Sequence, residues 1–154
     1  VVIHNAEESV FKRFAIECKF SEAYRSSGHR GLKSAYLEKE ALWEDIPELH
    51  ELAISINPKD SINRYLDTAQ LIKHILGLKS FCAKSKFKLL YLWYYGLGTD
   101  GAAHKEEIDA FTEIAKFDEV HFSSLSYQEL IFRLANENRD DNPEYVKYLT
   151  ERYL

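Results

Sequence analysis

The stretch RFAIECKFSEAY, residues 13–24, places a carboxylate and an ammonium group two residues apart in an otherwise apolar run. Side chains alternate along a β-strand, so Glu17 and Lys19 would share one face of it. Charges held beside a core need partners or a chemical task. A carboxylate suits Mg²⁺, and a neighbouring lysine can orient a metal-bound water. The spacing therefore fits phosphodiester cleavage, with the backbone carbonyl of Cys18 as a further metal ligand.

A simpler interpretation of the same residues is a solvated sheet face that carries a modest ion pair, because Glu-x-Lys is a common tripeptide. In such an unrelated α/β domain the two charged side chains would be exposed, and the later Gln70 would lie far away. In either case we expect the other side of the strand to face the core. Its side chains are those of Phe14, Ile16, Cys18 and Phe20.

The composition is that of one globular domain. The chain has 154 residues, of which 45% are hydrophobic, and this is enough for a single core but too little for two. The net charge of −5 argues against coating by nucleic acid through bulk electrostatics, although a local basic groove is compatible with it. We expect a cytoplasmic protein that makes no membrane contact, because no apolar run is long enough to span a bilayer and the two cysteines fit no disulfide framework.

The amino-terminal half predicts a hairpin followed by helices. β-branched residues indicate a strand over 1–5 and a second strand over 10–20, which together form an antiparallel hairpin. Residues 21–34 are rich in Ser, Gly and basic residues and predict a loop. Two helices are expected next, over 35–46 and over 47–56, the second with Pro47 in its first turn.

The carboxyl-terminal half alternates helices and strands. An apolar stripe predicts a helix over 61–77 that ends near Gly77. The run Leu89–Tyr95 predicts a strand buried on both faces. A helix over 103–117, a strand over 119–125, and helices over 126–138 and 142–154 are expected to follow, with Ser126 as N-cap of the first of these last two helices and Glu129 three residues on. The stripe of the 61–77 helix consists of Ile62, Tyr65, Leu66, Ala69, Ile72 and Leu76.

This order, together with AIECKFSEAY (15–24) and the later DTAQLIKHILGL (67–78), resembles the core of the PD-(D/E)XK nuclease superfamily. Within it, the chain is similar to restriction-endonuclease-like proteins whose strand reads close to IEVKYTE. The resemblance implies one restriction-endonuclease-like α/β domain over residues 1–154, a mixed β-sheet flanked by α-helices. It further implies a Mg²⁺-dependent deoxyribonuclease, with Mn²⁺ as an alternative ion. Glu17 would be the metal ligand and Lys19 the catalytic lysine.

One departure from the family pattern concerns the second metal ligand. The pattern has an acidic residue on the strand before Glu-x-Lys, and here the only acids upstream of Glu17 are Glu7 and Glu8, in the expected turn. The chain contains no methionine, so we expect residues to be missing before Val1, and we expect the acid to lie there.

Other residues are candidates through the resemblance or through their position. Gln70 and Lys73 would lean over the metal site, Gln70 with a catalytic role and Lys73 contacting the scissile phosphate. Glu22 and Tyr24 would position the site, or would simply end the strand. The expected loop carries Arg25, His29, Arg30 and Lys33, of which Arg25 and Arg30 are the candidates for gripping DNA phosphates, although an ordinary solvated loop fits them equally.

The histidines at 4, 29, 50, 74, 104 and 121 show no paired ligand spacing, so no zinc site is expected. The sequence thus favours a DNA nuclease of restriction, defence or repair type, acting on its own or as a homodimer. The alternative is a non-catalytic binding or assembly module on the same fold, which would bind no metal and would tolerate Glu17→Gln.

Overall fold

The computed structural model describes residues 1–4, 10–25, 28–96, 98–137 and 142–154. Within these ranges it confirms the expected α/β architecture. One mixed sheet has the strand order β1-β2-β3-β4. β1 runs antiparallel to β2, whereas β2, β3 and β4 are parallel. The strands are β1 (Val2–His4), β2 (Arg13–Lys19), β3 (Phe87–Trp93) and β4 (Phe122–Ser126).

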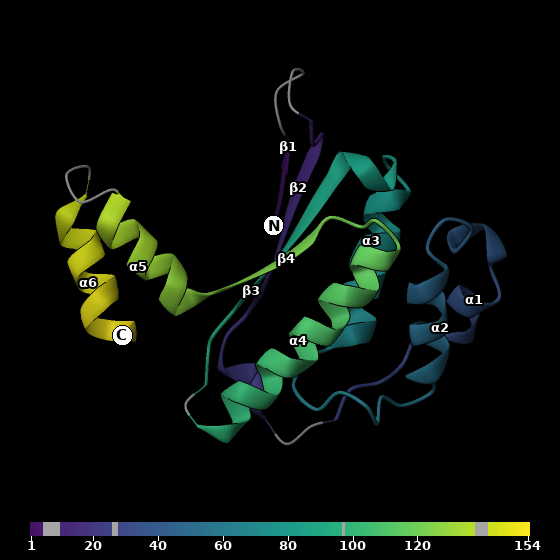
Figure 1. The fold of residues 1–154 in the computed structure, drawn as a ribbon, viewed down its shortest axis with the longest axis horizontal. Helices are drawn as coiled ribbons and strands as arrows, with labels where there is room; N and C mark the ends of the chain where they lie inside the picture. The colour runs from purple at the N-terminus through teal and green to yellow at the C-terminus, as the bar shows by residue number, and fades with distance from the viewer. Residues whose placement is uncertain (5–9, 26–27, 97, 138–141) are drawn as a thin grey trace.

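The helices divide between the two sides of this sheet (Figure 1). α2, α3 and α4 lie together on one side, whereas α5 and α6 form a helical hairpin on the other side, beyond the end of β4. The helices are α1 (Ser34–Leu37), α2 (Pro47–Ser55), α3 (Thr68–Lys79), α4 (Thr99–Phe117), α5 (Tyr127–Glu137) and α6 (Pro143–Tyr153). No helix within the described ranges is long and apolar enough to cross a membrane.

The hydrophobic core lies between the sheet and the α2–α4 side. Phe87, Leu89, Tyr91 and Trp93 alternate along β3 and are each at most 2% exposed. Ala15 of β2 belongs to the same core, beside Leu89 in the sheet register. Because alternate residues of a strand share a face, Glu17 and Lys19 point to this helix-covered side as well.

The expectation that Phe14, Ile16, Cys18 and Phe20 form the core side of β2 was therefore wrong. Cys18 is exposed, and the other three are only half-buried. β3 meets the expected burial on both faces only in part, because on its second face Leu92 is buried whereas Leu90 is half-buried. The reason is that the α5–α6 hairpin lies beyond the end of β4 and covers the second face incompletely (Figure 1).

Several helix boundaries differ from expectation. The expected helix 35–46 is reduced to α1 and a single 3₁₀ turn at Glu40–Leu42. α3 begins only at Thr68, because the side chain of Asp67 caps it, and it continues past Gly77 to Lys79. The residues before Thr68 lie in a loop, where Ile62 is 58% exposed and contributes nothing to the core.

Signals that act within a few residues were confirmed. Pro47 occupies the first turn of α2, as expected from its fixed φ and missing N–H. The Glu129 carboxylate accepts hydrogen bonds from the backbone N–H and the hydroxyl of Ser126, at 2.9 and 2.8 Å. The backbone N–H of Glu129 donates to the Ser126 hydroxyl in return, at 3.1 Å. This reciprocal cap starts α5 directly at the end of β4.

Candidate functional site

The candidate site is centred on Glu17, near the carboxyl end of β2. The carboxylate Oε1 lies 3.6 Å from Nζ of Lys19, and the side chains of Glu17 and Lys19 are only 14% and 19% exposed. The interpretation as an exposed surface pair therefore does not hold. Both charges therefore lie at the edge of the hydrophobic core, and His74 of α3 contacts the Glu17 carboxylate.

His74 of α3 makes the closest contact to the carboxylate. Its Nε2 lies 2.9 Å from Oε2 of Glu17, so the two carboxylate oxygens face different partners. The distance is that of a hydrogen bond. However, Nε2 is buried, and no described residue is oriented to form a hydrogen bond with it. The pair is therefore a close polar contact without the orientation of a well-formed hydrogen bond. Local sequence spacing gave no sign of it, because the pair forms only when α3 packs on β2.

The pKa of Glu17 reflects these neighbours. Burial alone would raise the pKa of this carboxyl, but the nearby His74 imidazole and the Lys19 ammonium outweigh burial and hold the pKa below its ordinary value. Glu17 is consequently ionised at neutral pH. An ionised and partly desolvated carboxylate is the form that binds a cation.

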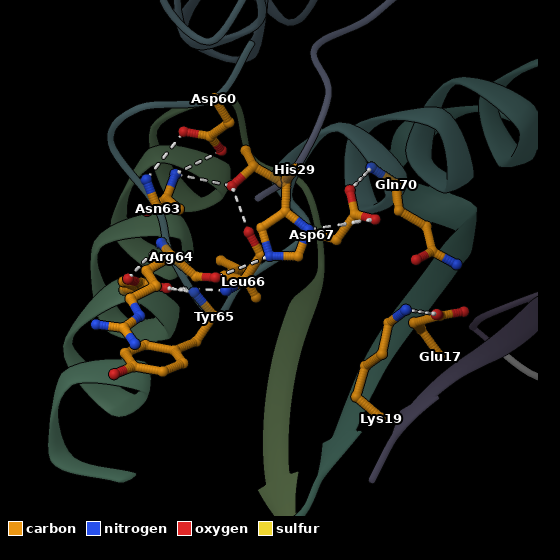
Figure 2. A network of polar contacts seen from close by, with 12 residues as sticks. Glu17, Lys19, His29, Asp60, Asn63, Arg64, Tyr65, Leu66, Asp67 and Gln70 are labelled. Carbon is orange, nitrogen blue, oxygen red and sulfur yellow. Dashed lines mark hydrogen bonds and ion pairs between the residues drawn. The ribbon is translucent and has the colours of Figure 1, made fainter. Parts of the chain in front are cut away.

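Gln70 lies one turn before His74 on α3. The carboxylate of Asp67 accepts a hydrogen bond from the Gln70 backbone N–H at 3.0 Å and so fixes the start of the helix. Figure 2 shows the Gln70 amide pointing towards the Glu17–Lys19 pair. The structure thus brings together the three side chains that the sequence analysis proposed as catalytic.

The loop that leads into α3 is held by α4. The carboxylate of Glu107 accepts hydrogen bonds from the backbone N–H groups of Arg64, Tyr65 and Leu66 at 2.8–2.9 Å. The imidazole Nε2 of His29 lies 3.0 Å from the Arg64 carbonyl (Figure 2). Glu107 was not among the expected residues, because its backbone partners lie some 40 positions away in the sequence.

A second polar group lies behind the site, in the core. The Tyr91 hydroxyl is 3.2 Å from Nε2 of His104, and Nδ1 of the same ring is 3.2 Å from the Tyr24 hydroxyl. Burial lowers the pKa of His104 to about 4, so this imidazole is neutral at pH 7. Tyr24 also donates to the Tyr94 carbonyl at 2.7 Å and accepts from the Gly96 N–H at 2.8 Å. Tyr24 thus joins the end of β2 to the segment after β3.

Two adjoining hollows give access to the site from the β1 edge. A cavity of ≈ 80 Å³ is lined by both Glu17 and His74, and a larger one of ≈ 210 Å³ shares His74 with it. The larger hollow is also lined by Lys73 and by Arg13, whose guanidinium lies 4.7 Å from the ring centre of Phe81. Lys73 therefore shares this hollow with His74, and Arg13 is a second cation there that the sequence analysis did not consider.

Within the part of the chain that the structure describes, the other candidates form no hydrogen bond or ion pair with the Glu17 and Lys19 side chains. Arg25 and Arg30 are exposed in the segment after β2, and Arg30 forms an isolated antiparallel bridge with Lys59. The Glu22 carboxylate accepts from the Phe20 backbone N–H at 3.0 Å, which fixes the end of the strand. Glu7 and Glu8 lie outside the described residues.

Mg²⁺ takes one or two protein carboxylates and keeps several of its waters. Among the described residues, no group of three His, Cys, Asp or Glu side chains is arranged around a common ion position. Glu17 supplies one carboxylate, and the carbonyl of Cys18 lies on the strand beside it. The Lys19 carbonyl accepts from the backbone N–H of Tyr94, directly after β3, at 2.9 Å, so the Cys18 carbonyl, one residue away, points to the β1 side. These donors fit a partial site for a hydrated cation.

Comparisons with known proteins place the whole chain in one family. Searches of curated proteins and of solved structures returned no match. A family model matches residues 1–154 and is described as "Restriction Endonuclease associating with ARP". The chain therefore belongs to this REase-ARP family.

Proposed function

We propose that the protein is a metal-dependent nuclease of PD-(D/E)XK type that hydrolyses DNA phosphodiester bonds. The observation that carries the proposal is the burial of Glu17 and Lys19 on the helix-covered face of β2, beneath Gln70. Burying charged side chains costs desolvation free energy. An ion pair with only a solvated surface role would not be expected at such a covered position. The family description, which names a restriction endonuclease, supports the same activity.

Each residue has a role that follows from its place. Glu17 and the Cys18 carbonyl would hold Mg²⁺, which when bound supplies positive charge to the phosphate and acidifies a coordinated water. The Lys19 ammonium, 3.6 Å from the Glu17 carboxylate, would orient the attacking water and offset negative charge on the phosphate. Gln70 would donate from its amide to a phosphate oxygen. The water oxygen would form the new bond to phosphorus as the bond between phosphorus and the sugar oxygen breaks. The attacking water would release one proton to solvent, and the leaving sugar oxygen would take one proton from solvent.

The register of the hairpin indicates where a second carboxylate would lie. Val2 pairs with Ala15, and Val1 exchanges backbone hydrogen bonds with Ile16 at 2.8 and 2.9 Å. Where the chain continues upstream of Val1 as a strand, its next residue would pair with Glu17. Directly opposed residues of an antiparallel pair share a face, so an acid there would complete the metal site.

DNA would approach along the hollows at the β1 edge. Arg13 and Lys73 line the larger hollow and can contact phosphate oxygens on either side of the scissile bond. A local groove of this kind reconciles DNA binding with a net charge of −5. Two copies acting together would be a further source of affinity, and sedimentation of the protein with and without DNA would detect them.

The test is a cleavage assay on protein expressed from its complete coding sequence. Plasmid DNA, single-stranded DNA and RNA are incubated with Mg²⁺ or with EDTA. We expect Mg²⁺-dependent DNA cleavage that Lys19→Ala lowers by about 10²–10⁴-fold, the range for losing a group that acts on the reacting water. The matched control Lys105→Ala removes an exposed lysine of α4 that pairs with Asp109 and should leave the rate unchanged. Equal rates in both variants, or cleavage of RNA alone, would overturn the proposal.

A second candidate is a non-catalytic assembly module. It is favoured by the two basic neighbours that already offset the charge of Glu17, and by the association with ARP that the family description names. In that case the folded protein would bind a protein partner without cleaving DNA, and Glu17→Gln would leave partner binding intact. Co-purification of the wild type and Glu17→Gln with the partner, beside the cleavage assay, separates the two functions.

A further inference from the structure

We infer that His74 is a metal ligand beside Glu17, and that the site takes a first-row transition cation such as Mn²⁺ in preference to Mg²⁺. This inference deepens the proposed function and rests on it in taking Glu17 as a metal ligand. It assigns a role to a histidine that has no catalytic part in that proposal.

The first observation is the distance between the two side chains. Nε2 of His74 and Oε2 of Glu17 are 2.9 Å apart. Two ligand atoms that each lie about 2.1 Å from an octahedral ion are about 3 Å apart when they are neighbours on it. The pair therefore already has the spacing of adjacent ligands, and a cation could join them with little movement of either side chain.

The second observation is the state of the imidazole nitrogen. Nε2 is buried, and no described residue gives it a hydrogen bond of good geometry, although the ring as a whole is 42% exposed. A buried polar nitrogen without a properly oriented partner costs free energy, and a bound cation would offset this cost. Neutral imidazole is a ligand for transition metals.

The third observation is space beside both groups. The cavity of ≈ 80 Å³ touches Glu17 and His74 and is otherwise walled by residues of the hairpin and β3. A water occupies about 30 Å³ in the liquid, so the cavity has room for an ion with a water ligand. Its other walls are Val1, Val2, Ala15, Ile16 and Leu89, so the carboxylate and the imidazole are the polar side chains that line it.

The donor set decides which cation is favoured. Carboxylate and carbonyl oxygens suit Mg²⁺ and Mn²⁺ alike, whereas an imidazole nitrogen favours the transition metal. Lys19 faces the other carboxylate oxygen and leaves Oε2 to the metal. Without the imidazole, the same site would retain only oxygen donors and would lose its preference for Mn²⁺.

The experiment is a titration of the whole protein with Mn²⁺, in which electron paramagnetic resonance measures the free hexaaqua ion. We expect one Mn²⁺ to bind per chain, His74→Ala and His74→Gln to weaken binding at least 10-fold, and Mg²⁺ affinity from competition to change less than threefold. The control His121→Ala, which alters an exposed histidine before β4, should bind Mn²⁺ as the wild type does. Mn²⁺ affinities within twofold of each other in the wild type and both His74 variants would overturn the inference.

A second readout needs no variant. Electron spin echo modulation of the bound Mn²⁺ should show coupling to a nitrogen nucleus, and its absence would overturn the inference even if every variant misfolds. Loss of the inference does not remove the proposed function, because Mg²⁺-dependent cleavage that is lost in Lys19→Ala would still stand. Conversely, His74-dependent Mn²⁺ binding by a protein that cleaves no DNA would support the site and overturn the nuclease.

Discussion

The two faces of β2 differ in burial, and the difference is the opposite of what their side-chain types suggest. The face with Ala15, Glu17 and Lys19 is covered by helices, although two of its three residues are charged. The opposite face carries Phe14, Ile16 and Cys18, yet it is less buried, and Cys18 is exposed. Burial on this strand therefore follows where the helices pack, and the charged residues that they cover are the candidates for chemistry.

The largest effect on stability is expected from one of two neighbouring leucines of β3. Leu89 points to the helix-covered face and is 1% exposed, whereas Leu90 points to the other face and is half-buried. Leu89→Ala should lower the free energy of unfolding by about 2–5 kcal/mol, and Leu90→Ala by roughly half as much. Urea denaturation measures both values, and equal losses would show that the two faces are covered alike.

The next effect is expected on the cleavage rate, from a substitution in α3, the helix that covers the charged face. Gln70→Ala should slow DNA cleavage by about 10–100-fold, because the amide would no longer donate a hydrogen bond to the phosphate oxygen. Gln128→Ala removes an amide from α5, on the other side of the sheet, and serves as the control (Figure 1). Single-turnover rates at saturating protein give the comparison. A Gln70 variant as fast as the Gln128 variant would remove Gln70 from the site.

A smaller effect concerns the pH dependence of stability. The folded-state pKa of Glu17 lies below its ordinary value of 4.5, so the ionised carboxylate stabilises the fold above that value, and this contribution is lost as the pH falls through the folded-state pKa. We expect Glu17→Gln to lower the free energy of unfolding by about 1–2 kcal/mol at pH 7, because Lys19 and His74 lose their charged partner. Denaturation at several pH values should show this difference shrinking below pH 4.5. A difference that grows on acidification would contradict the assigned direction of the shift.

The smallest effect is expected on the less covered face of β2. Cys18→Ser changes an exposed side chain and leaves the backbone carbonyl in place, so stability should change by less than about 0.5 kcal/mol. The cleavage rate should stay within twofold of the wild type. A large loss of either would mean that the interaction of the Cys18 thiol with Tyr127 contributes to the fold or to catalysis.

The sequence predicted those elements whose signals lie within a few residues. Ser126 and Glu129 mark the start of a helix by themselves, and Pro47 does the same for α2. Which face of β2 is buried could not be predicted in this way. Alternation along the strand divides the side chains into two faces, but which face is covered depends on how α3 packs. The contact of His74 with Glu17 spans 57 positions, so no local spacing could indicate it.

The most direct test of the account is a single-turnover cleavage measurement with Mg²⁺ that compares the two faces of one strand. Protein from the complete coding sequence is assayed as wild type, Glu17→Ala and Cys18→Ala on the same DNA, with circular dichroism confirming the fold of each. The account predicts that Glu17→Ala abolishes cleavage, whereas Cys18→Ala cleaves within twofold of the wild type. Cleavage by Glu17→Ala at the wild-type rate would contradict the central claim that the charged, helix-covered face of β2 is the catalytic centre.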